Sequence, residues 1–129
     1  MSLSARQIRT AATFWSALML VRRPQMRAEV RERFEERLMK FLADPPAPLG
    51  FDGVHLGTEV TPDAMLALAA EQAGIAIVGH ELWPWYYKTR FTDDGLVLQR
   101  GKDAGVEAVP LVEGEEGGFA SEPSLDGGF

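Results

Sequence analysis

The sequence contains no cysteine, and this absence removes several kinds of chemistry. Disulfide bonds, thiolate zinc sites, iron–sulfur clusters and thiol nucleophiles all require cysteine side chains. Histidine is scarce too, because His55 and His80 are the only two in the chain. His80 and Glu81 begin like an H-E-x-x-H zinc motif, but Pro84 occupies the position of the second histidine. This motif is therefore absent.

One further group of potential metal ligands comprises Asp52, His55 and Glu59. These side chains would share one face only if the segment were helical, and Gly53 and Gly57 disfavour a helix there. We therefore expect neither a metal site nor a cofactor.

Motifs for nucleophilic catalysis and phosphate binding are also missing. None of the five serines lies in a G-x-S-x-G turn, and no G-x-x-x-x-G-K-[ST] loop occurs. A pair of carboxylates could be assembled from Glu81, Asp93 and Asp94, but a hairpin turn already accounts for the last two. The sequence predicts no catalytic residues and a protein that is not an enzyme.

The chain has no long hydrophobic run. Its clearest apolar stretch, AATFWSALMLV at residues 11–21, is too short for a bilayer, which needs about 20 residues. Arginines and Pro24 follow this stretch, where a signal peptide would have a cleavage site with small residues. We expect no membrane span, no secretion signal, and a location in the cytoplasm or within an assembled particle.

Charge is unevenly distributed along the 129 residues. Residues 1–43 carry nine Lys/Arg and four Glu, a net charge of +5, whereas the remainder carries four Lys/Arg and fifteen Asp/Glu, a net charge of −11. The overall charge is −6. Such segregation indicates a basic surface for an acidic partner, or two oppositely charged ends that attract each other within or between copies.

The first 43 residues have the pattern of a helical hairpin. Ser4 and Gln7 form an S-x-x-Q capping box, which predicts a helix over 5–21. Apolar residues then recur every four positions from Met26 to Leu42, and Pro24 suits the first turn of a second helix over 24–42. A third helix is predicted to begin at Thr61, with Pro62 in its first turn, and to stop at Gly74.

The remaining segments predict a linker, short strands and a tail. Three prolines favour an extended linker over 44–60, and Asp93-Asp94-Gly95 predicts a hairpin turn. Strands are expected within 75–78, 85–91, 96–100 and 106–112, the last at an edge because it contains Pro110. The predicted fold is α+β: the hairpin 1–43, the linker 44–60, a helix and antiparallel meander in 61–112 of the same domain, and an extended acidic tail over 113–129.

Residues 79–101 contain two of the three tryptophans and both tyrosines. Alternation along a strand would place Trp83, Trp85, Tyr87 and Phe91 on a face that packs against the helices. Tyr86, Lys88 and Arg90 would then lie on the outer face and could contact a partner. Whether Arg100 joins them depends on the hairpin register, which the turn alone does not fix.

The tail 113–129 has five acidic and no basic residues, a composition that cannot bury enough apolar surface to fold alone. Phe119, Leu125 and Phe129 are its candidate partner-binding residues. With the outer-face residues, they predict a non-enzymatic structural or interaction protein. Such a protein would be a small subunit of a larger assembly, for example a phage particle, and would bind other protein subunits, including copies of itself.

The alternative is a DNA-binding regulator of the winged-helix type. Ala70, Gly74 and Ile75 follow a helix-turn-helix spacing, and a hairpin with the basic residues Lys88 and Arg90 comes next. The acidic net charge, together with glycine and proline in the would-be recognition helix, makes nucleic acid the less favoured partner.

Overall fold

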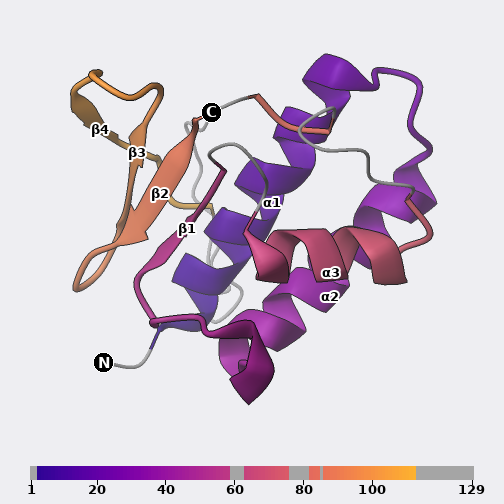
Figure 1. The fold of residues 1–129 in the computed structure, drawn as a ribbon, viewed down its shortest axis with the longest axis horizontal. Helices are drawn as coiled ribbons and strands as arrows, with labels where there is room; N and C mark the ends of the chain where they lie inside the picture. The colour runs from indigo at the N-terminus through magenta and orange to yellow at the C-terminus, as the bar shows by residue number, and fades with distance from the viewer. Residues whose placement is uncertain (1–2, 59–62, 76–81, 85, 113–129) are drawn as a thin grey trace.

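The computed structural model describes residues 3–58, 63–75, 82–84 and 86–112. A layer of helices packs against one antiparallel sheet, which confirms the predicted α+β fold (Figure 1). The elements in chain order are α1 (Ala5–Arg22), α2 (Ala28–Ala43), the 3-10 helix η1 (Ala47–Leu49), β1 (His55–Gly57), α3 (Ala64–Gln72), β2 (Lys88–Phe91), β3 (Leu96–Gln99) and β4 (Val106–Ala108).

Helix α1 begins as the capping box predicts. The Ser4 hydroxyl accepts from the Gln7 backbone N–H at 3.0 Å, and the Gln7 side-chain oxygen accepts from the Ser4 backbone N–H at 2.9 Å. Two of the four N–H groups that lack helical partners are thereby satisfied. The helix continues one residue past the predicted end, to Arg22.

Helix α2 starts at Ala28 rather than at Pro24, so the prediction for this end was wrong. Pro24 lies instead in the reversal between the two helices, where the Met26 N–H donates to the Arg23 carbonyl at 3.0 Å. A proline with a fixed φ and no N–H suits such a turn as well as it suits a first helical turn.

The sequence predicted Thr61 as the cap of the third helix, but helix α3 is capped by Asp63. The Asp63 carboxylate accepts from the Met65 N–H at 2.9 Å; Thr61 and Pro62 are outside the described residues. Burial raises the pKa of Asp63, against the lowering effect of the Met65 hydrogen bond. The predicted stop at Gly74 is confirmed, because its φ of +88° is a left-handed conformation that favours glycine.

The sheet has four strands in the order β1-β2-β3-β4, all antiparallel. Strand β1 lies within the predicted linker 44–60, so this segment is not only a linker. Strand β2 begins at Lys88 and not at Trp85, since Tyr86 has a φ of +60° and interrupts the extended conformation; Trp85 itself is outside the described residues. Strand β4 covers only three residues of the predicted 106–112, at the predicted edge.

Aromatic side chains join the sheet to the helices. Trp83 is fully buried between Trp15 of α1, at a ring-centroid distance of 6.0 Å, and Phe34 of α2, at 5.8 Å. Its indole N–H donates to the Trp15 carbonyl at 2.9 Å, and Phe91 is buried on the inner side of β2. The predicted packing of Trp83 and Phe91 against the helices is confirmed, although Trp83 precedes the strand.

Of the predicted strand at 75–78, residues 76–78 are outside the described part of the chain. Within the described ranges, no helix is both long and apolar enough to cross a membrane.

Candidate interaction surfaces

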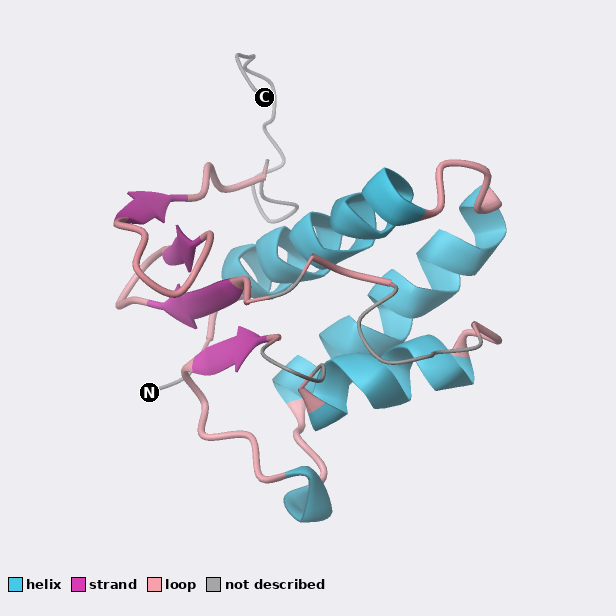
Figure 2. Ribbon diagram, turned by 45° about the horizontal axis from the view of Figure 1, so that its top comes forward, coloured by secondary structure: helices cyan, strands magenta, loops and turns pink. Residues whose placement is uncertain are grey.

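The register of the sheet defines a face that points away from the helices. One cross-strand row contains His55, Arg90, Val97 and Ala108, and the next contains Gly57, Lys88, Gln99 and Val106. The residues between them, such as Leu56, Thr89 and Leu98, are buried on the opposite side, toward the helices. The eight residues of the two rows are called the outer face below. Figure 2 shows the strands on one side of the molecule and the helices on the other.

The outer face is cationic and partly apolar. Its two rows carry Lys88 and Arg90 and no Asp or Glu, while the His55 ring at one end contacts the Asp52 carboxylate at 2.8 Å. Arg90 is exposed, and Val106 has 59% of its surface exposed. Tyr86 lies beside this face because the Lys88 ammonium stands 5.0 Å from the centre of its ring, within the range of a cation–π contact. The structure therefore brings Tyr86, Lys88 and Arg90 together.

Arg100 does not join this face. Gln99 pairs with Lys88, so the next residue turns to the side of the helices. There the Arg100 guanidinium donates to Glu107 at 2.6 Å. Its hydrogen bond to Glu107, and a weaker contribution from Tyr87, raise the pKa of Arg100. Arg100 thus belongs to a groove of about 260 Å³ between α1 and strands β3 and β4, where Phe14 and Ala17 form part of one wall.

The described chain ends on α1. The Val112 N–H donates to the Thr10 hydroxyl at 3.0 Å, and the Arg6 guanidinium donates to the Val112 carbonyl at 2.7 Å. Phe119, Leu125 and Phe129 follow and are outside the described residues, so their partner-binding role stays a prediction.

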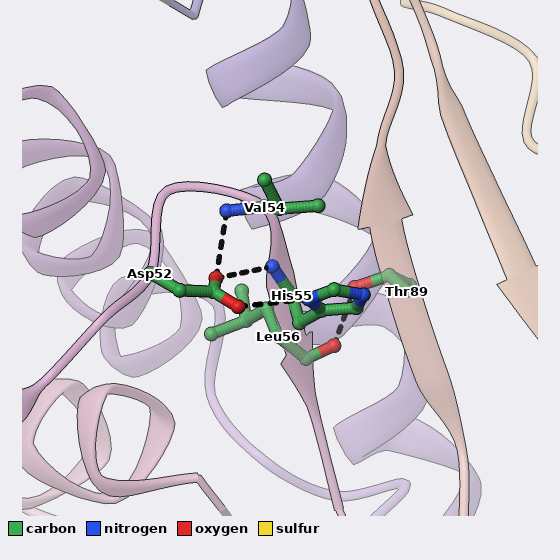
Figure 3. A network of polar contacts seen from close by, with 5 residues as sticks. All are labelled: Asp52, Val54, His55, Leu56 and Thr89. Atoms are coloured by element: carbon green, nitrogen blue, oxygen red, sulfur yellow. Dashed lines mark hydrogen bonds and ion pairs between the residues drawn. The ribbon is translucent and has the colours of Figure 1, made fainter. Parts of the chain in front are cut away.

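Asp52 and His55 form a local polar network at the start of β1 (Figure 3). One Asp52 oxygen accepts from the backbone N–H groups of Val54 and His55, both at 2.8 Å, and the other contacts the His55 ring nitrogen Nδ1 at 2.8 Å. Burial is the largest single effect and raises the pKa of Asp52, but the hydrogen bonds from His55 and Val54 together outweigh it and leave the pKa at about 2. The carboxylate therefore shapes the turn that leads into β1.

The third member of the candidate metal group, Glu59, is outside the described residues. Elsewhere in the described ranges, no three His, Asp or Glu side chains come together as metal ligands. His80 and Glu81 also lie outside these ranges.

A second basic surface lies at the turn between α1 and α2. Arg22, Arg23 and Arg27 line an open hollow of about 590 Å³, whose apolar lining includes Met26 and Ile75. We call this hollow the basic corner. The sequence signal for this surface is the presence of three arginines within residues 22–27, in the basic N-terminal segment.

Models of known protein families give no match to this chain, and a search of curated proteins finds no significantly similar sequence.

Proposed function

We propose that this protein is a non-enzymatic interaction protein, a small subunit of a larger macromolecular assembly, and that its outer face binds an acidic surface of a partner subunit. The observation that carries the proposal is the composition of that face. Its two cross-strand rows contain Lys88 and Arg90 without one acidic side chain, in a protein whose net charge is −6.

The physical properties of the outer face suit a protein interface. Exposed arginine and aromatic side chains are enriched at interfaces, and Val106 adds apolar area beside the charges. The Lys88 ammonium over the Tyr86 ring supports a fixed position for the cation. Leu125 and Phe129 of the acidic tail are proposed as a further contact with neighbouring subunits.

The winged-helix alternative requires a recognition helix between α3 and β2. Residues 82–84 of that interval are described and are not helical, while residues 76–81 and 85 are outside the described part. No observation favours this alternative over a protein partner, and the experiment below distinguishes the two.

The test is affinity purification of the tagged full-length chain from its native source. Lys88→Glu/Arg90→Glu should lose the co-purifying partner, because like charges facing each other across an interface cost several kcal/mol, or more than about a hundredfold in affinity. Arg37→Glu/Lys40→Glu on α2 makes the same change in net charge and should retain it.

An unchanged set of partners in the Lys88→Glu/Arg90→Glu sample would refute the proposed surface. Duplex DNA binding that falls steeply with salt and disappears in the same variant, with no protein partner captured, would favour the regulator instead.

A further inference from the structure

The basic corner has both charge and apolar lining. Arg22 and Arg27 are exposed there, and Met26, Val30 and Ile75 supply apolar surface around the same hollow. Glu29 is the acidic neighbour of Arg27, at 3.5 Å, and both side chains are mostly exposed. Such an exposed pair contributes little to stability, and one glutamate beside three arginines leaves the corner with a net positive charge. An acidic segment with a large apolar side chain would complement this hollow.

An apolar stripe on α1 leads to the basic corner. Phe14, Ala17 and Val21 follow one another at helical spacings of three and four residues, which places them on one side of the helix. Phe14 and Ala17 line the groove that also contains Val112. Val21, next to Arg22, has 68% of its surface exposed, the highest value among the large hydrophobic side chains in the described ranges. The stripe therefore joins the end of the described chain to the corner.

The segment that follows Val112 has the matching composition and length. Residues 113–119 read EGEEGGF, with three glutamates before Phe119. Thr10, which holds Val112, precedes Arg22 by twelve residues, or about 18 Å along a helix at 1.5 Å per residue. Seven extended residues reach about 23 Å. Phe119 can thus arrive at the corner with Glu115 and Glu116 beside the arginines.

We propose that residues 113–119 bind along α1 of the same chain, with Glu115 and Glu116 against Arg22 and Arg27 and Phe119 in the hollow of the basic corner. A segment tethered this closely has an effective concentration in the millimolar range, which favours its own chain over a second copy. Leu125 and Phe129 lie further along and keep their proposed role with partner subunits. This binding does not involve the outer face, so tail binding at the basic corner and partner binding at the outer face can be refuted independently.

The absence of cysteine allows a clean experiment on the full-length chain. A nitroxide is attached to Ser121→Cys, two residues after Phe119, and amide signals are recorded with the label oxidised and reduced. We expect the Met26 and Ile75 signals to be largely lost with the oxidised label and the Lys40 signal to persist. In 1 M salt, where the Debye length falls to about 3 Å, these signals should return.

Charge exchange supplies the matched variants. Arg22→Glu/Arg27→Glu should restore the lost signals, and so should Glu115→Lys/Glu116→Lys, whose changes lie in the tail and leave the described residues intact. Combining all four substitutions should abolish the signals again, because the complementary charges are re-formed with opposite sign. Arg37→Glu/Lys40→Glu should behave like the parent chain.

A mixed sample separates the same chain from a second copy. Unlabelled ¹⁵N protein is combined with spin-labelled ¹⁴N protein, and the inference predicts no signal loss. Signal loss in this mixture would show binding between copies and overturn the inference. Persistent Met26 and Ile75 signals in the singly labelled parent chain would overturn it as well.

Discussion

Gln7 joins the first turn of α1 to the β2–β3 hairpin, and replacing it by glutamate gives a sharp test of this link. The side chain is 1% exposed. Its amide nitrogen donates to the carbonyls of Thr92 and Gly95 at 2.8 and 3.0 Å, while its oxygen accepts from Ser4. Gln7→Glu preserves the capping box but places a carboxylate oxygen against two carbonyls. The variant must either bury a repelled charge or bind a proton.

The free energy needed to protonate the new carboxylate determines how much Gln7→Glu destabilises the fold. A glutamate has an ordinary pKa of about 4.3, and each pH unit above it costs about 1.36 kcal/mol, so protonation at pH 7 costs about 3.7 kcal/mol. The protonated acid keeps one of the two hydrogen bonds to carbonyls, and losing the other adds about 1 kcal/mol. We expect Gln7→Glu to lower the free energy of unfolding by about 4–5 kcal/mol at pH 7. Because the pKa of the new carboxyl is raised in the folded state, this deficit shrinks to about 1 kcal/mol near pH 3.

The assay is urea unfolding of the parent chain and the variant at matched pH values, followed by tryptophan fluorescence. Gln7→Met is the control, since it removes the side-chain hydrogen bonds to Ser4, Thr92 and Gly95 without adding a titrating group and should show a deficit that is constant with pH. A deficit for Gln7→Glu below about 1 kcal/mol at pH 7, or one that does not change between pH 7 and pH 3, would refute the assigned role of the amide.

Three further predictions concern local structure. A Cβ on Gly57 would stand 2.6 Å from the Tyr87 carbonyl oxygen, so Gly57→Ala should lower the free energy of unfolding in urea by about 1–3 kcal/mol. Gly105 has open space around it, so the control Gly105→Ala should change this free energy by less than about 0.5 kcal/mol. Burial raises the pKa of the Asp63 carboxyl, which means that the charged form is disfavoured in the folded state. Asp63→Asn removes this charge and keeps a capping oxygen, so its melting temperature at pH 7 should match or exceed that of the parent. Asp63→Ala removes the cap and should lower the free energy of unfolding by about 1 kcal/mol. A higher melting temperature for the alanine than for the asparagine variant would contradict this. The pKa of Asp52 is depressed to about 2, so its stabilising contribution is present above about pH 4 and lost as the pH falls toward 2. The difference in urea midpoint between the parent and Asp52→Ala should shrink over that range, and a difference that grows instead would contradict the assignment.

Local patterns predicted the helices well and the sheet less well. Ser4, Gln7 and Gly74 determine helix ends through contacts within a few residues, which a sequence displays directly. Strand β1 has only three residues, one of them Gly57, too few for alternation to be visible, and it exists through its pairing with β2. Strand β1 could therefore be recognised only from its pairing with β2 in the structure.

The outer face could be predicted only in part, for a related reason. Lys88 and Arg90 lie on the face that strand alternation predicts. The start of β2, however, is set by the left-handed backbone of Tyr86, and a tyrosine in the sequence does not indicate that conformation. The place of Arg100 follows from the register of β2 with β3, which the turn residues leave open. The basic corner depends on Ile75 meeting the α1–α2 turn, a contact between distant parts of the chain.

The attachment of Val112 to Arg6 and Thr10 has a consequence for biosynthesis. These bonds join residues 106 and 102 positions apart, and the first carbonyl partner of Gln7 lies 85 positions after it. During synthesis α1 precedes these partners, so the Gln7 amide nitrogen and the Arg6 guanidinium meet their carbonyls only after Thr92, Gly95 and Val112 have been added. Folding that depends on such distant pairings is slow, so α1 is synthesised before the sheet but completes its contacts only after the sheet is present.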